Sequence, residues 1–171
     1  MTIAQTTPTL TGERADLLQT LGKHRGFLLF TVQNITEEQA KLRTTVSELT
    51  LGGLIKHVAD VEESWARFIV EGPAAMAGGN EDWANGHRLV EGETLAGALA
   101  RYQEVARKTD EIVASLPDLD VDHPLPEAPW FEKGARWSAR RVLLHILAET
   151  SQHAGHADII REALDGQKSM G

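Results

Sequence analysis

The chain has 171 residues, of which 42% are hydrophobic, and this size and composition favour a single domain with its own apolar core. Its 17 Lys and Arg against 25 Asp and Glu give a formal net charge of −8, which would repel the phosphate backbone of a nucleic acid. No apolar run reaches the roughly 18–20 residues of a membrane span and the first ten residues do not resemble a signal peptide, so we expect a cytoplasmic protein without membrane partners.

The first half of the chain is expected to hold two long helices. Residues 1–10 read as a loose lead-in, and apolar residues at helical intervals then predict a helix over Glu13–Gln33. After a polar connector, Ile35–Leu49, Thr50 is a suitable N-cap for a second helix with one apolar stripe. The Gly-Pro pair at 72–73 is expected to end that helix.

The second half predicts two further helices separated by long connections. Glu71–Gly92 is rich in glycine and acidic residues and is expected to be a long, functional loop. A third helix over Thr94–Ser115 is followed by a proline-rich irregular stretch, Asp118–Gly134. A fourth helix is expected over residues 138–164, with a serine as its N-cap and Gly166 as its left-handed C-terminal residue. With no strand expected, the fold class is all-α, a four-helix bundle with long crossover connections.

Candidate chemical groups concentrate on two of the predicted helices. His57 lies on the second helix, and the fourth carries His145, Glu149, His153 and His156. At about 100° per residue, positions 145, 149 and 153 share one face of the fourth helix, and the flanking apolar residues turn that face towards the interior. A carboxylate and imidazoles in that position need partners, because burying an uncompensated charge costs several kcal/mol.

A divalent metal ion would supply such a partner. Because the chain has no cysteine, the ligands must be His, Asp or Glu. Glu149 and His153, four residues apart, can reach one ion, and His57 is the natural third ligand from another helix. Two histidines and one carboxylate suit zinc, with nickel, iron and manganese as alternatives, and leave positions open for water and substrate.

The spacing by itself leaves other interpretations open. A Glu–His pair four residues apart also occurs on solvated helix faces as a weak electrostatic contact, and a single histidine on an apolar face is often an ordinary core residue. His145 is either a partner of the site or simply buried, and His156 is expected at the rim as a hydrogen-bonding or acid–base group. Three tryptophans are expected to belong to the core or to a pocket wall: Trp65, Trp130 and Trp137.

Two segments resemble the signature regions of the DinB/YfiT-like superfamily, in particular the branch catalogued as domain of unknown function 664. They are LGGLIKHVADVE at 51–62 and LLHILAETSQHAGHADIIRE at 143–162, the latter preceded by Arg-Trp-Ser at 136–138. The resemblance implies a four-helix bundle with a metal ion held by His57, Glu149 and His153. Many members have histidine at the position of Glu149, and glutamate there resembles the branch of mycothiol-dependent maleylpyruvate isomerase.

The resemblance also implies an activity, because characterised relatives are transferases or isomerases that use mycothiol, bacillithiol or glutathione. We therefore expect a metal-dependent S-transferase or thiol-assisted isomerase for a small electrophile, with the thiol as cosubstrate. In this hypothesis His156 or His145 moves a proton, and Trp65 and the Glu71–Gly92 loop line the pocket for substrate and thiol. A metal-dependent hydrolase and a non-catalytic metal- or small-molecule-binding stress protein remain alternatives, and a homodimer is compatible with the sequence.

Overall fold

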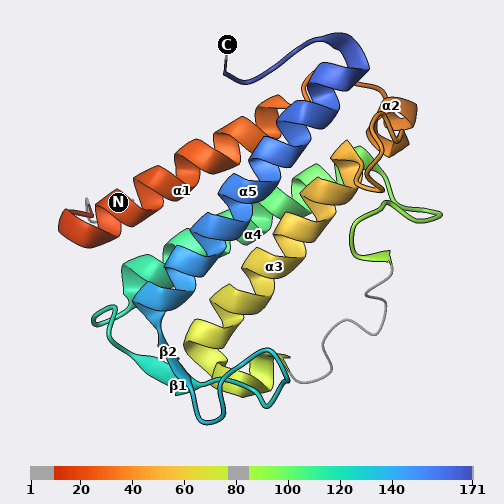
Figure 1. Cartoon of the computed structure of the whole chain (residues 1–171). Coiled ribbons are helices and arrows are strands. Elements are labelled where there is room, and N and C mark those ends of the chain that lie inside the picture. The colour runs from red at the N-terminus through yellow and green to blue at the C-terminus, as the bar shows by residue number, and fades with distance from the viewer. Residues whose placement is uncertain (1–9, 77–84, 171) are drawn as a thin grey trace, which may run out of the picture.

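The computed structural model describes residues 10–76 and 85–170 and consists mainly of four long helices (Figure 1). They are α1 (Gly12–Phe30), α3 (Leu51–Glu71), α4 (Leu95–Ser115) and α5 (Ala139–Asp165). Helix α3 packs against both α4 and α5, whereas α1 packs mainly against α5 and also contacts α4. The expected all-α four-helix bundle is therefore confirmed, while the lead-in expected over 1–10 lies outside the described residues except for Leu10.

The connections between the helices are long, and two of them contain short helical turns. Helices α1 and α5 run in one direction and α3 and α4 in the other, so the α3–α4 connection returns along the bundle (Figure 1). It begins with a 3₁₀ turn, η1 (Gly72–Met76), and part of the loop expected there, residues 77–84, lies outside the described residues. The connector between α1 and α3, expected to be a polar connector without a helix, contains a short helix, α2 (Glu37–Lys41).

The connection between α4 and α5 contains two short strands, although the sequence predicts none. Strand β1 (Asp122–Pro124) pairs antiparallel with β2 (Arg136–Ser138), with His123 opposite Trp137. A strand of three residues is too short for alternation to be visible in the sequence, and its pairing depends on residues far along the chain. This small sheet contacts η1 and the base of α5, so it closes one end of the bundle.

The ends of the long helices follow local sequence rules. Thr50, Thr94 and Ser138 each accept a hydrogen bond from the backbone N–H three residues later, at 3.2, 3.0 and 3.2 Å. At the end of α5, Gly166 has a φ of 80° and donates its N–H to the carbonyl of Glu162 at 2.9 Å. The caps predicted at Thr50, Ser138 and Gly166 are confirmed.

A buried ion pair separates two apolar clusters in the core. One cluster contains Leu54 and Val58, and the other contains Phe68. Between them, Arg25 of α1 donates from Nε to Glu62 of α3 at 3.2 Å and forms a second, closer contact with the same carboxylate; its Nη1 donates to Asp110 of α4 at 2.9 Å. The network links three helices, and Glu62 is completely buried. Because an unpaired buried charge is costly, this pairing favours one relative position of the helices.

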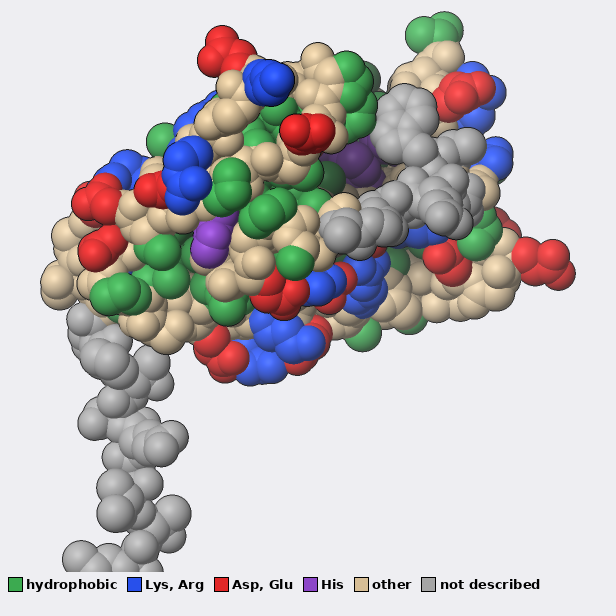
Figure 2. Space-filling model, turned by 90° about the horizontal axis from the view of Figure 1, so that it is seen from below, with side chains coloured by type: hydrophobic (Ala, Val, Ile, Leu, Met, Phe, Trp, Pro, Cys, Tyr) green, Lys and Arg blue, Asp and Glu red, His purple; other side chains and the backbone are tan. Residues whose placement is uncertain are grey.

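The surface carries mixed charges. On the face shown in Figure 2, acidic and basic side chains lie next to one another. Arg101 of α4 illustrates the pattern, because it pairs with both Asp60 and Glu63 of α3. None of the described helices is long and apolar enough to cross a membrane.

Candidate metal centre

The three predicted ligands converge between α3 and α5. Nε2 of His57 lies 3.9 Å from Oε2 of Glu149, and Nε2 of His153 lies 3.6 Å from the same oxygen. The ring centroids of His57 and His153 are 4.7 Å apart. One turn of α5 separates Glu149 from His153, and the packing of α3 on α5 brings His57 to them. The structure thus brings together residues that are distant in sequence.

These donor atoms fit a divalent cation. A tetrahedral ion with bonds of about 2.0–2.1 Å needs its donor atoms about 3.3–3.4 Å apart. The separations of 3.6 and 3.9 Å are within a small side-chain adjustment of that value. The side chains of His57, Glu149 and His153 are 18%, 29% and 11% exposed, so the cluster is reachable from solvent on one side. A cation held here would keep positions free for further ligands.

The protonation states also suit a metal site. The imidazoles of His153 and His57, which face the carboxylate, hold the pKa of Glu149 far below its usual range, although burial acts in the opposite direction. An ionised carboxylate is the form that binds metal. Nδ1 of His156 lies 3.3 Å from Nδ1 of His153, so one ring must carry the proton that the other accepts. This contact leaves Nε2 of His153 directed at Glu149 and orients the ring.

A fourth imidazole, that of His87, lies in the same cluster and is not among the predicted ligands. The ring of His87 stacks on that of His57 with centroids 3.9 Å apart and planes 25° apart. One potential ligand atom from each of His57, His87 and His153 lies within 4.8 Å of the other two. Burial, and then the charges of His57 and His153, lower the pKa of His87, which favours the neutral ring that can bind a metal.

The segment that carries His87 is held directly against α3. A Cβ atom built on Gly53 would lie 1.9 Å from the carbonyl oxygen of His87, so the two backbones touch there. Lys56 donates to the carbonyl of Arg88 at 3.3 Å and to Glu93 at 2.8 Å, which ties the following residues to the same helix. The glycine pair that opens α3 is the available sequence signal, because glycine is a poor helix former and often marks a close backbone approach.

Two further predicted site residues, His145 and Trp65, lie beside the cluster formed by His57, Glu149 and His153. His145, one turn before Glu149, has its ring 4.8 Å from that of Trp65 and 5.3 Å from that of Trp137. The two tryptophans stack at 4.7 Å and form an apolar wall, and burial lowers the pKa of His145. Trp130, by contrast, is 77% exposed, which corrects its expected place in the core or wall. It lies in a turn of the connection between α4 and α5, where its ring contacts that of the neighbouring Phe131. Roles for His145, His156 and Trp65 in the chemistry stay predictions.

The architecture and the site together define a class of protein. A four-helix bundle with a histidine of α3 opposite a Glu-x-x-x-His pair of α5 is the DinB/YfiT-like arrangement that the sequence resembles. Residues 16–166 match the family described as mycothiol-S-transferase, a match that covers most of α1 and all of α3, α4 and α5. The chain belongs to this family of thiol-dependent transferases. No curated protein matches the chain.

Proposed function

We propose that the chain is a metal-dependent S-transferase that joins a low-molecular-weight thiol, mycothiol, to a small electrophile. The observation that carries the proposal is the approach of the His57 and His153 nitrogens to one oxygen of Glu149, at 3.9 and 3.6 Å. Family membership supports a thiol as the nucleophile. The chain has no cysteine, so that thiol must come from a cosubstrate.

The ligand set is part of the proposal. His57, Glu149 and His153 would hold the cation, with His87 as a fourth donor within reach, and this combination of nitrogen and oxygen donors favours zinc. When bound, such a cation supplies Lewis acidity, which lowers the pKa of a coordinated thiol towards neutrality. The side chains are partly exposed, so a thiol of modest size has access to the cluster.

The chain's own residues would move the proton and shape the pocket. His156 lies beside His153 and would accept the thiol proton on Nδ1, the atom that contacts Nδ1 of His153, when that hydrogen bond opens. The sulfur then forms a bond to the electrophilic carbon, while the bond from that carbon to its leaving group breaks and the leaving group departs with the electron pair. The stacked rings of Trp65 and Trp137 would give the electrophile an apolar wall next to the site.

The first test is a turnover assay with mycothiol and a chromogenic aryl halide. Protein loaded with zinc is expected to consume thiol and halide in equal amounts, and a chelator is expected to abolish turnover while the far-UV circular dichroism stays that of a folded bundle. Turnover that continues without thiol would instead indicate a hydrolase. A protein that unfolds when the metal is removed would indicate a structural ion.

The second test uses variants of the proposed ligands. Glu149→Gln and His153→Ala are expected to lose about 100-fold or more in turnover together with most of the bound zinc. Glu162→Gln, on the exposed side of α5, and His24→Ala, on α1, are matched controls that should keep both. Wild-type turnover in Glu149→Gln would contradict the proposal.

A further inference from the structure

Arg141 extends the row of candidate site residues on α5 towards the start of that helix. It precedes His145 by four residues, as His145 precedes Glu149, and each step of four residues turns the side chain by only about 40°. Helix α3 packs on α5 and runs in the opposite direction, from His57 to Trp65 (Figure 1). The row therefore leads from the candidate metal centre to the tryptophan rings at the end of the bundle that carries the small sheet.

The guanidinium of Arg141 is connected to the candidate metal centre by a short series of contacts. Its central carbon lies over the ring of Trp137, 4.3 Å from the centroid, and the same ring lies 5.3 Å from that of His145. One helical turn, about 6 Å along the axis, then separates His145 from Glu149. Burial has the largest effect on the pKa of His145 and lowers it; Glu149 opposes this effect, and the positive charge of Arg141 adds to it.

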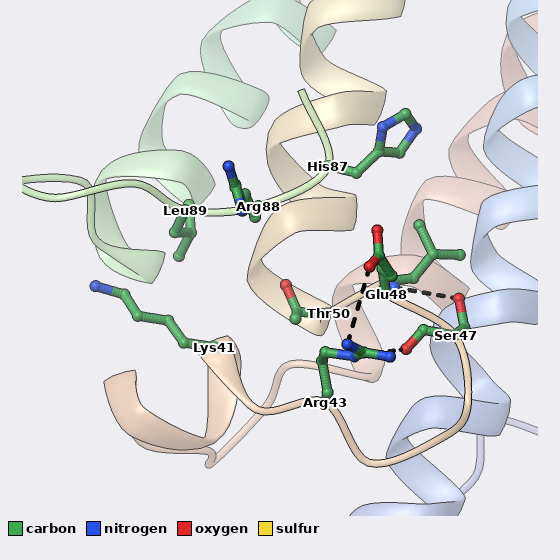
Figure 3. A pocket seen from close by; sticks show the side chains of 9 residues that line it. Lys41, Arg43, Ser47, Glu48, Thr50, His87, Arg88 and Leu89 are labelled. Carbon is green, nitrogen blue, oxygen red and sulfur yellow. Dashed lines mark hydrogen bonds and ion pairs between the residues drawn. The ribbon is translucent and has the colours of Figure 1, made fainter. Parts of the chain in front are cut away.

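Arg141 differs from the other arginines because its side chain has no polar partner. In the parts of the chain that the structure describes, every other arginine donates from its side chain to a carboxylate, an amide or a backbone carbonyl. Figure 3 shows one of them, Arg43, which donates to the carbonyl of Ser47 at 3.0 Å and lies 3.9 Å from Glu48. The exposed guanidinium of Arg141 thus keeps its N–H groups for a ligand, in a chain whose net charge is −8.

The contact with Trp137 prepares Arg141 to bind an anion. Stacking uses the flat face of a guanidinium and leaves the N–H groups, which lie in its plane, free to meet a carboxylate. A side chain that is restricted in this way loses less freedom when it binds. Helix stability does not explain the residue, because Arg141 lies in the first turn of α5, where the helix dipole disfavours a positive charge.

We propose that Arg141 determines the specificity of the reaction by binding a carboxylate carried by the electrophile. The carboxylate would accept two parallel hydrogen bonds from the guanidinium, and the apolar body of the electrophile would lie along the partly exposed rings of Trp137 and His145. The inference rests on the proposed function, in which the thiol occupies the metal centre. It is assigned to the electrophile because mycothiol, an amide of N-acetylcysteine with an amino sugar joined to inositol, has no acidic group apart from its thiol.

The kinetic test compares 4-(bromomethyl)benzoate and its longer biphenyl homologue, each with its own methyl ester, at saturating mycothiol. In each reaction the sulfur bonds to the benzylic carbon, bromide leaves with the electron pair of the broken bond, and the thiol proton goes to His156. For at least one of the two lengths we expect kcat/KM to be about tenfold or more higher for the acid than for its ester, the size of one or two charge-assisted hydrogen bonds.

Variants of Arg141 test whether this residue causes the preference. Arg141→Gln should remove it by raising KM for the acid, and should leave the ester unchanged. Arg141→Lys keeps the charge but not the planar fork, so it should restore only part of the preference. Arg107→Gln, at an exposed arginine of α4 that pairs with Glu104 and Glu111, is the control for the loss of one charge. An Arg141→Gln protein that melts at a lower temperature but keeps the full preference would show a structural contact only, and would overturn the inference.

A binding measurement separates this inference from the proposed function. Titration of the metal-loaded protein with 4-methylbenzoate, followed by tryptophan fluorescence, needs no turnover. We expect binding that is about tenfold weaker for 4-methylbenzamide and about tenfold weaker in Arg141→Gln. Equal kcat/KM values for acid and ester at both lengths, in an active enzyme, would overturn the role of Arg141 alone. An inactive protein that still binds 4-methylbenzoate through Arg141 would overturn the S-transferase proposal and keep the anion site.

The pattern of inhibition shows which reaction partner carries the acid. If the carboxylate of the electrophile occupies the guanidinium, 4-methylbenzoate should compete with 4-(bromomethyl)benzoate and should not compete with mycothiol. Competition with mycothiol alone would overturn the assignment to the electrophile.

Discussion

Gly53 and His87 are in direct backbone contact, and the contact leaves no room for a side chain at Gly53. A Cβ atom there would lie 1.9 Å from the carbonyl oxygen of His87 and 2.8 Å from Cα of Arg88. Real Cβ atoms do not approach backbone atoms so closely, so any larger residue at position 53 must displace the segment. The first turn of α3 thereby decides where His87 lies relative to His57.

The first prediction is that Gly53→Ala displaces His87. We expect a loss of about 1–3 kcal/mol in the free energy of unfolding, the usual cost of overpacking, together with weaker zinc binding. Gly22→Ala, in the exposed interior of α1 with no atom within 4 Å of the new Cβ, should instead stabilise the protein by about 0.5–1 kcal/mol. Urea denaturation and zinc titration measure both quantities. Unchanged zinc affinity and stability in Gly53→Ala would show that the segment does not rest on α3.

The second prediction concerns His87 itself. If its ring completes the ligand set, His87→Ala should weaken zinc binding about tenfold or more without changing the fold. Competition with a chromophoric chelator measures the affinity, and the visible spectrum of the cobalt-loaded protein reports the change in coordination. His24→Ala is the control, because His24 lies on α1 and contacts Phe27. An affinity and a cobalt spectrum equal to those of the wild type would exclude His87 from the ligands.

The third prediction concerns the buried ion pair between Arg25 and Glu62. Among the described residues, Glu62→Gln leaves the buried Arg25 guanidinium with Asp110 as its one charged partner, so we expect a loss of about 3–5 kcal/mol in the free energy of unfolding. Glu63→Gln, one residue along α3, breaks an exposed pair with Arg101 and should cost less than about 1 kcal/mol. Urea denaturation distinguishes the two, and equal effects would argue against a stabilising role for the buried network.

The fourth prediction is a pH dependence that comes from His145. Burial lowers the pKa of His145 in the folded protein below the usual histidine value of about 6.5, so the unfolded chain binds a proton at a higher pH than the folded one does. The contribution of the neutral His145 ring to the free energy of unfolding is therefore fully present above about pH 6.5. It is lost as the pH falls towards the pKa of His145 in the folded protein.

Melting temperatures of the chelator-treated protein between pH 5 and pH 8 test this linkage. The wild type should lose stability as the pH falls through this range, and His145→Asn should lose less of it over the same interval. His24→Asn, on α1, controls for the removal of one histidine. Identical pH profiles for the wild type and His145→Asn would contradict the prediction.

Local features of the structure follow from the sequence because they depend on neighbouring residues. The spacing of apolar residues predicts the four long helices, and the hydroxyl groups of Thr50 and Ser138 mark where two of them begin. The four-residue spacing of Glu149 and His153 also fixes that pair on one face of α5. The exposed position of Trp130 is not predictable in this way, because hydrophobicity alone indicates a core residue.

The tertiary structure decides which distant groups meet. Whether His57 is a ligand or an ordinary core histidine depends on how α3 packs against α5, and periodicity within one helix contains no such information. The same holds for His87, whose position depends on the contact of its backbone with Gly53. The sequence by itself determined the four long helices, the caps of two of them and half of the candidate ligand set, since these arise from interactions within a few residues. Only long-range packing determined the complete candidate site, because it depends on the relative positions of separate segments.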